Sequence, residues 1–239
     1  MIDIEQKHKI EFLLNGKNLP LDLKLEILDH MMEQVDYKMG FEGKDFSNAL
    51  DEIKESWKED FRIKKTFIYS ERRTKILRDT IQKTNVEILK KASLYIMVYF
   101  FLSIFLITIS KIVSYYFHYI FFISLVATFL MIVISDFKTI WSCRDMESKK
   151  ISYLQKGVAK LITYSFFIVI FILRNFNLKF EKYYDGFQHL IQEFSFSMNF
   201  LMSFIIYNLF IFIWIQGFFY YLEYKKTLKY LEQKINFKL

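Results

Sequence analysis

Cysteine, proline and glycine are scarce in this sequence, and each shortage narrows what the chain can be. The single cysteine, Cys143, excludes an intramolecular disulfide and a zinc site built on paired cysteines. Only 6 glycines and 1 proline stand among 239 residues, whereas 28 are phenylalanine and 53% are apolar. This composition indicates a protein whose solvent is lipid.

Charge is divided unevenly along the chain. Residues 1–60 have a net charge of −7, residues 61–91 have +7, and the remainder has +7 again. The overall charge of +7 is therefore no nucleic-acid signature, because it sums an acidic domain, a basic connector and a membrane region with basic flanks. We expect the basic parts to contact the anionic lipids of an inner leaflet.

The acidic segment 1–60 has the periodicity of three short helices. Asp3 is a suitable cap for a first helix that ends before Gly16, Pro20 suits the first turn of a second, and Asp45 can cap a third. On the second helix, apolar residues recur at three- and four-residue steps: Leu21, Leu25, Leu28, Met32, Val35 and Met39. We predict a small three-helix domain with a limited core.

The basic segment 61–91 contains neither glycine nor proline, so we predict that it is one long connector helix leading into the membrane. Met1 to Lys17 is charged and lacks an apolar core, which predicts that insertion is directed by the first spanning segment.

Four apolar stretches are candidates for membrane spans, because a bilayer core of about 30 Å requires ~20 apolar residues in a helix. They lie at about 92–110, 117–135, 158–174 and 198–222. The loop with Lys111 has one cation, whereas Lys138 to Lys160 and the tail 225–239 are rich in lysine, which places the latter two inside. The prediction is an all-α, polytopic membrane protein with cytoplasmic N- and C-termini, in the cytoplasmic (inner) membrane of a bacterium.

The stretch 175–197 is the longest predicted outer loop. Tyr184, Phe187, Leu190, Ile191 and Phe194 share one helical face. We therefore predict an amphipathic helix that lies on the outer leaflet.

Polar side chains inside the spans are few. No Asp, Glu, Lys or Arg lies at mid-depth, and such groups are what ion-coupled transporters usually need. Asn199, Asn208 and Gln216 on the last span are the exceptions, and buried amides most often make hydrogen bonds between helices. Small residues that allow close helix approach are also scarce, with Gly217 among the few.

An acidic ridge runs along the second helix at helical steps, formed by Glu26, Asp29, Glu33 and Asp36 together with His30. One interpretation is that this ridge is simply a solvated helix face, and the more specific one is that it is a docking surface for a basic partner. Asp29 and His30 are sequence neighbours, which do not face each other on a helix, so they are no catalytic pair.

No catalytic, cofactor or metal motif is present in the sequence. His118, His189 and Glu193 are the only candidates on the outer side for a membrane-embedded enzyme, and no spacing joins them into a metal motif. Cys143 has the features of an inert loop thiol, although a cytoplasmic cysteine near a span is also a candidate for acylation. We therefore expect a non-enzymatic protein.

The first helices resemble a known group. Residues Glu26 to His30, then Met39-Gly40, then Phe46 to Leu50 and Trp57 are similar to the helical prefix of bacterial HAAS-type signalling domains and permease-prefix domains. The resemblance covers about a quarter of the chain. It implies a non-enzymatic regulatory or adaptor role, without implying transport, because the membrane part has no permease motif.

Two hypotheses follow. The first is an inner-membrane adaptor or accessory subunit that binds a protein partner through the helical domain, the spans or both, with another membrane protein or a second copy as partner and no nucleic acid. The alternative is a small transporter or lipid-handling membrane protein.

Overall fold

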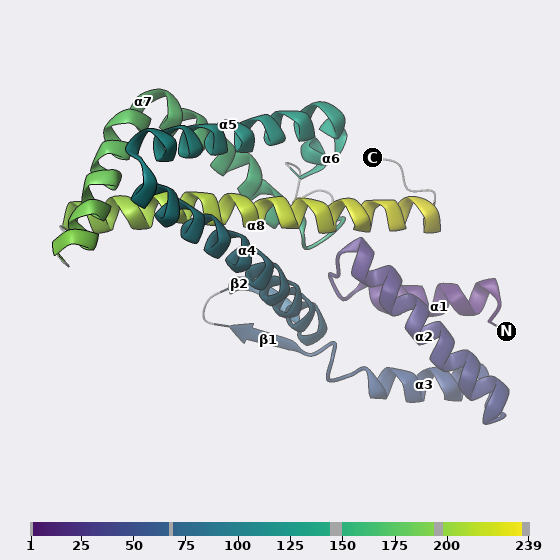
Figure 1. Ribbon diagram of the computed structural model, residues 1–239. Coiled ribbons are helices and arrows are strands. Elements are labelled where there is room, and N and C mark those ends of the chain that lie inside the picture. Colours follow the sequence, from purple (N-terminus) through teal and green to yellow (C-terminus); the bar gives the residue numbers. More distant parts are fainter. Residues whose placement is uncertain (1, 67–68, 144–149, 194–197, 236–239) are drawn as a thin grey trace. The chain divides into compact units, whose positions relative to one another are not determined.

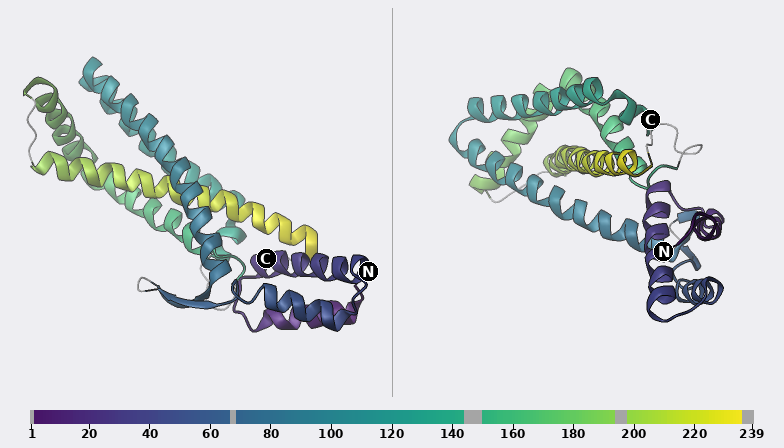
Figure 2. Two further views of the ribbon diagram at one scale, coloured as in Figure 1. Left: turned by 90° about the horizontal axis from the view of Figure 1, so that it is seen from below. Right: turned by 90° about the vertical axis from the view of Figure 1, so that its right-hand side faces the viewer.

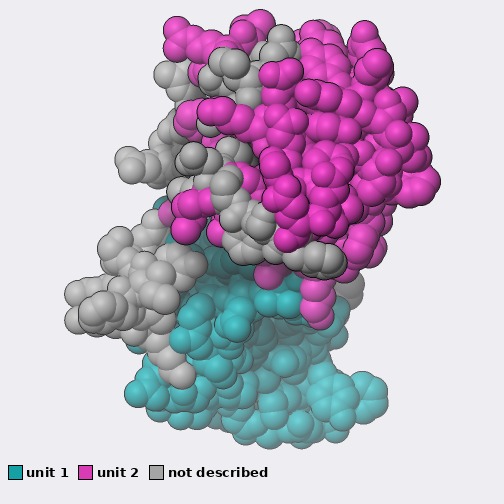
Figure 3. Space-filling view, turned by 60° about the vertical axis from the view of Figure 1, so that its left-hand side comes forward, with its two compact units in different colours: residues 1–86, 147–153 teal, residues 87–146, 154–239 magenta. Residues whose placement is uncertain are grey.

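The computed structural model describes residues 2–66, 69–143, 150–193 and 198–235. Apart from the connecting loops, these residues are helical except for one two-stranded antiparallel hairpin (Figure 1), in agreement with the predicted all-α class. The chain forms two compact units, coloured separately in Figure 3. Unit 1 consists of residues 1–86 and 147–153, and unit 2 of residues 87–146 and 154–239.

Unit 1 begins with the three predicted helices, α1 (Ile4–Asn15), α2 (Leu21–Phe41) and α3 (Phe46–Ser56). Asp3 and Gln6 form a reciprocal capping box at the start of α1, with N–O distances of 2.7 and 3.0 Å. The Asp45 carboxylate accepts hydrogen bonds from the first amides of α3. The caps predicted at these two positions are confirmed.

The core of this helical domain is centred on α2, because both α1 and α3 pack against it. Its buried side chains come from all three helices, and Leu77 of a later helix adds one more: Ile10, Leu14, Leu23, Ile27, Leu28, Met31, Val35, Ala49, Leu50, Ile53 and Leu77. The predicted stripe of α2 was partly wrong, since Leu25, Met32 and Met39 are only half-buried at the edge of this core. A helix covered from two sides buries a wider arc than one stripe.

The predicted connector helix over residues 61–91 is wrong in its first half. Strands β1 (Ile63–Thr66) and β2 (Tyr69–Thr74) form a hairpin there, with Ile63 opposite Thr74, and α4 begins only at Lys75. This segment is rich in β-branched and aromatic residues, which favour strands, and its many cations would repel one another along a helix.

Unit 2 contains most of α4 (Lys75–Ile109), then α5 (Lys111–Ser135), the short α6 (Phe137–Ser142), α7 (Gln155–Glu193) and α8 (Met198–Ile235). Among the described residues, three helices are long and apolar enough to cross a membrane: α4, α5 and α8. Three of the predicted spans lie within them. The fourth, 158–174, lies within α7, which is helical but is not among the three.

Helices α7 and α8 lie side by side and antiparallel (Figures 1 and 2). Glycine allows their closest approach: a Cβ on Gly217 would lie 2.6 Å from the backbone nitrogen of Leu161, and one on Gly157 would overlap the ring of Tyr220. Between helices, small residues at such points let the backbones meet. Small residues are scarce in the sequence, yet Gly157 and Gly217 stand where this pair of helices approaches most closely.

The predicted outer loop is instead a continuation of α7, up to Glu193. Part of the predicted face is covered by protein: Phe187 is buried with Ile107 of α4 and Phe200 of α8, and Tyr184 and Leu190 are half-buried against them, whereas Ile191 is exposed. The prediction of a separate helix is therefore wrong, because this segment continues α7, and its position on the outer leaflet stays a prediction. The last predicted member, Phe194, lies outside the described residues.

Candidate functional site

The predicted acidic ridge lies on the side of α2 that faces away from its core. Glu26, His30, Glu33 and Asp36 are exposed, and Asp29 is half-buried. The His30 ring stands 3.8 Å from the Glu33 carboxylate. The structure thus brings all five predicted residues onto one helix surface, as their spacing requires.

Two aromatic rings extend this surface, and the sequence analysis missed them. Tyr37 and Phe41 follow Glu33 at four-residue steps, and their rings stack with centroids 4.9 Å apart. They are 57% and 83% exposed. Large apolar side chains this exposed are informative when they stand together beside charges. We call the surface formed by Glu26, His30, Glu33, Asp36, Tyr37 and Phe41 the acidic-aromatic face.

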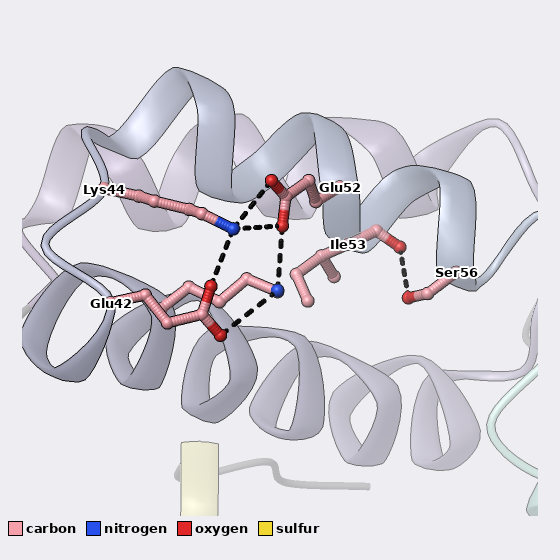
Figure 4. Close-up of polar contacts among 6 residues, drawn as sticks. Glu42, Lys44, Glu52, Ile53 and Ser56 are labelled. Atoms are coloured by element: carbon pink, nitrogen blue, oxygen red, sulfur yellow. Dashed lines mark hydrogen bonds and ion pairs between the residues drawn. The ribbon is translucent and has the colours of Figure 1, made fainter.

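Two lysines are held at the corner between α2 and α3 (Figure 4). Glu52 accepts from Lys38 and Lys44 at 2.8 and 2.7 Å, and Lys44 also lies 2.6 Å from Glu42. Hydrogen bonds from the two lysines lower the pKa of Glu52 to about 2. These ion pairs of Lys38 and Lys44 lie outside the acidic-aromatic face.

A second polar group is buried in unit 2, and no sequence motif indicated it. His118 of α5 is fully buried, with Nε2 2.8 Å from the Ser103 hydroxyl of α4 and Nδ1 2.7 Å from the Ser114 carbonyl oxygen. Ser103 Oγ in turn lies 3.3 Å from the Tyr183 hydroxyl of α7. We call these four residues the buried polar chain; it joins three helices.

The predicted intramembrane amides have different environments. The Asn208 amide nitrogen donates to the Phe204 carbonyl at 2.9 Å and is also hydrogen-bonded to Tyr183, so it extends the buried polar chain to α8. Gln216 is half-buried on the same helix. The side chain of Asn199 lies outside the described residues.

The sequence signals for the buried polar chain are local and weak. Ser114 and His118 are four residues apart, which places them on one face of a helix. Nothing in the sequence relates either of them to Ser103 or Tyr183, because those contacts join separate helices.

Polar contacts also surround the C-terminal end of α5. The Asp136 carboxylate accepts hydrogen bonds from Tyr221 and Lys225 of α8. Burial raises the pKa of the nearby Cys143 thiol to about 12. Because Cys143 is buried and its thiol donates to the Thr139 carbonyl, it lacks the thiolate character of a reactive cysteine.

His189 and Glu193, weighed as possible outer ligands, form an exposed pair 3.4 Å apart on α7. Within the described ranges, no group of three His, Cys, Asp or Glu side chains is placed to hold a metal ion.

Comparisons with protein-family models, curated proteins and solved structures found no match to this chain.

Proposed function

We propose that this protein is a membrane-anchored adaptor of the bacterial cytoplasmic membrane, whose helical domain binds a basic protein partner through the acidic-aromatic face. The observation that carries the proposal is this face itself. Its acids and stacked rings belong to the one helix whose other sides are already buried by α1 and α3. The face therefore contributes nothing to its own core and remains accessible.

The chemistry of the face indicates the kind of partner. Exposed carboxylates attract lysine and arginine and so accelerate association with a basic partner. A guanidinium group or an apolar side chain can pack against the stacked rings. Aromatic residues are also typical anchors of protein interfaces. A basic amphipathic segment satisfies both requirements. This role agrees with the resemblance of the first helices to bacterial helical prefix domains.

The proposed topology has four spans, with both termini in the cytoplasm. One structural observation supports it: residues 150–153, in the lysine-rich loop, belong to the same compact unit as the helical domain. The chain passes through α4 and α5 between these two parts. Two crossings return the chain to the side from which it started, as the positive-inside rule requires here.

The test is affinity purification of the full-length protein from its native membranes in mild detergent, with bound proteins identified by mass spectrometry. The variant Glu26→Lys/Glu33→Lys/Asp36→Lys reverses the acidic-aromatic face. We expect a stoichiometric protein partner to bind the wild type and to be lost from this variant.

The matched control reverses three exposed acids elsewhere in the helical domain, in the variant Asp51→Lys/Glu55→Lys/Glu59→Lys. It changes the net charge by the same amount, so the control should retain the partner. A partner that survives reversal of the acidic-aromatic face would contradict the proposal. So would preparations that contain only this chain in every sample.

The alternative, a small transporter or lipid-handling protein, has one observation in its favour, the buried polar chain. Polar groups buried between membrane helices sometimes bind a substrate rather than one another. Substrate-dependent flux in proteoliposomes that disappears in His118→Phe or Asn208→Leu, while His189→Phe retains it, would favour this class over the adaptor.

A further inference from the structure

The N-terminus of α2 lacks a cap of its own. Pro20 stands at the cap position and makes no side-chain hydrogen bond there, so the first amides of the helix need acceptors from elsewhere. Leu21 N–H donates to the carbonyl oxygen of Lys150 at 3.0 Å, and Asp22 N–H donates to that of Ile151 at 3.1 Å. Two residues from the connection between α6 and α7 therefore cap α2.

Side chains of the same short segment, residues 150–153, bind the helical domain as well. Ile151 and Ser152 are only 3% and 5% exposed. The Lys150 ammonium donates to Asn18 Oδ1 at 3.1 Å. Tyr153 packs against the core of the helical domain, and its hydroxyl lies 3.0 Å from Thr84 Oγ1 of α4. The segment is thus seated through both its backbone and its side chains.

The carboxyl group of Asp22 lies within this contact. It accepts a hydrogen bond from Leu23 N–H at 2.8 Å and another from the Ser152 hydroxyl. Burial raises the pKa of Asp22 to about 6, the hydrogen bonds oppose this, and Glu26 one turn further along α2 adds to it.

The lysines around Asp22 are engaged with other groups. Lys150 contacts Asn18, as described above, and the Lys24 ammonium lies 3.1 Å from Glu11 Oε1 and 2.6 Å from Asn15 Oδ1. Tyr153, the remaining titratable group of the segment, is paired with Thr84. Asp22 therefore has hydroxyl and amide donors and one acidic neighbour.

We propose that Lys150–Tyr153 is a docking segment that caps α2, and that protonation of Asp22 strengthens its docking. α7 begins two residues after Tyr153, at Gln155. A displacement of α7 would therefore pull directly on the cap of the helix that carries the acidic-aromatic face. The inference concerns contacts within the chain, so it stands or fails independently of any partner.

The direction of the pH dependence follows from the pKa of Asp22. A docked pKa of about 6, against an ordinary value of 3.8, means that the docked state binds the proton more tightly than the released state. Docking is therefore strongest in acid and weakens as the pH rises through 6. Between pH 5.5 and 7.5, this shift corresponds to about a fourfold change in the docking equilibrium.

Amide hydrogen exchange measures the docking directly. The first amides of a helix have no hydrogen-bond partner within the helix, so those of α2 are protected only while the docking segment is bound. The experiment uses the full-length protein in lipid nanodiscs at pH 5.5 and 7.5, with residue-resolved mass spectrometry and correction for intrinsic exchange. We expect Leu21 and Asp22 to be protected, about fourfold more at pH 5.5. Asp22→Asn should keep the protection and abolish its pH dependence.

Ile151→Asp places a charge in the buried contact, so it should remove the protection of Leu21 and Asp22 while amides within Ile27–Val35 stay protected. Ile151→Ala is the milder variant, in case the first one unfolds the helical domain. Glu55→Gln, on the exposed surface of α3, is the control and should behave like the wild type.

Unprotected amides at Leu21 and Asp22 in the wild type, or protection that persists in both Ile151 variants, would overturn the docking segment. Equal protection at the two pH values, or a fourfold difference that survives Asp22→Asn, would overturn the role of the proton.

Discussion

At the scale of single residues, the same side chain occurs in opposite environments. His30 lies on the solvent face of α2 beside Glu33, whereas His118 is fully buried and hydrogen-bonded to residues of its own helix and of α4. A buried polar group without partners loses the interactions it had in water, so the partners of His118 are required for its burial. This makes His118 the residue on which the buried polar chain depends.

We expect His118→Phe to destabilise unit 2 by about 1 kcal/mol, at the low end for a buried hydrogen bond because bonds between membrane helices are modest. The apparent melting temperature in detergent should fall by a few degrees. Cys143 provides the readout, because a thiol-reactive fluorescent maleimide can label this buried cysteine only as the protein unfolds.

The matched control is His189→Phe, which changes an exposed histidine on α7. Its melting temperature should equal that of the wild type. If both variants melt alike, the buried polar chain does not stabilise the protein.

At the scale of elements, close backbone approach decides how two helices pack, and local propensity decides whether a segment forms a helix or a strand. The contact between α7 and α8 depends on glycines that are far apart in the sequence, and the hairpin β1–β2 formed where a helix was predicted. Although no glycine or proline interrupts this segment, the preference of Ile, Thr and Tyr for strands made it a hairpin. An uninterrupted segment is therefore insufficient evidence for a helix.

Gly217→Ala should separate α7 from α8 locally, because the added Cβ would lie 2.6 Å from the backbone nitrogen of Leu161 and 2.8 Å from its Cα. Backbone atoms cannot move aside as a flexible side chain can. Overpacking of this kind costs about 1–3 kcal/mol. The expected result is a lower melting temperature in the Cys143 labelling assay.

Gly40→Ala is the control for this substitution, since a Cβ there would meet nothing within 4 Å. Replacing glycine inside a helix normally stabilises by about 0.5–1 kcal/mol, so the melting temperature should not fall. Equal melting of Gly217→Ala and the wild type would mean that the two helices are less closely packed than described.

At the scale of the whole molecule, the number of spans decides where each loop lies. Within the part of the chain that the structure describes, three helices meet the requirements of length and composition, and α7 is the proposed fourth. If α7 crosses, Asp185 lies outside and Lys229 inside. If it does not cross, both positions change sides.

Single cysteines in a Cys143→Ser background test this topology. In intact spheroplasts, a membrane-impermeant maleimide should label Asp185→Cys but neither Gly40→Cys nor Lys229→Cys. The latter two should react only after the membrane is permeabilised. Labelling of Lys229→Cys in intact cells, with none of Asp185→Cys, would establish three spans instead.

The sequence by itself determined the all-α class, the three helices of the helical domain with their caps, and the apolar stretches within α4, α5 and α8. These features depend on neighbours a few residues apart, through capping, helical periodicity and the length of apolar runs. The four acids and the one histidine of the predicted ridge share one surface for the same reason.

Only the tertiary structure decided which surfaces are covered. It buried part of the α7 face that was predicted to meet lipid, left Tyr37 and Phe41 exposed beside the ridge, and gathered Ser103, His118 and Tyr183. It also seated residues 150–153 on the N-terminus of α2. Each of these contacts joins segments distant in sequence, and no local pattern specifies which distant group will satisfy a buried polar atom or cover an apolar face.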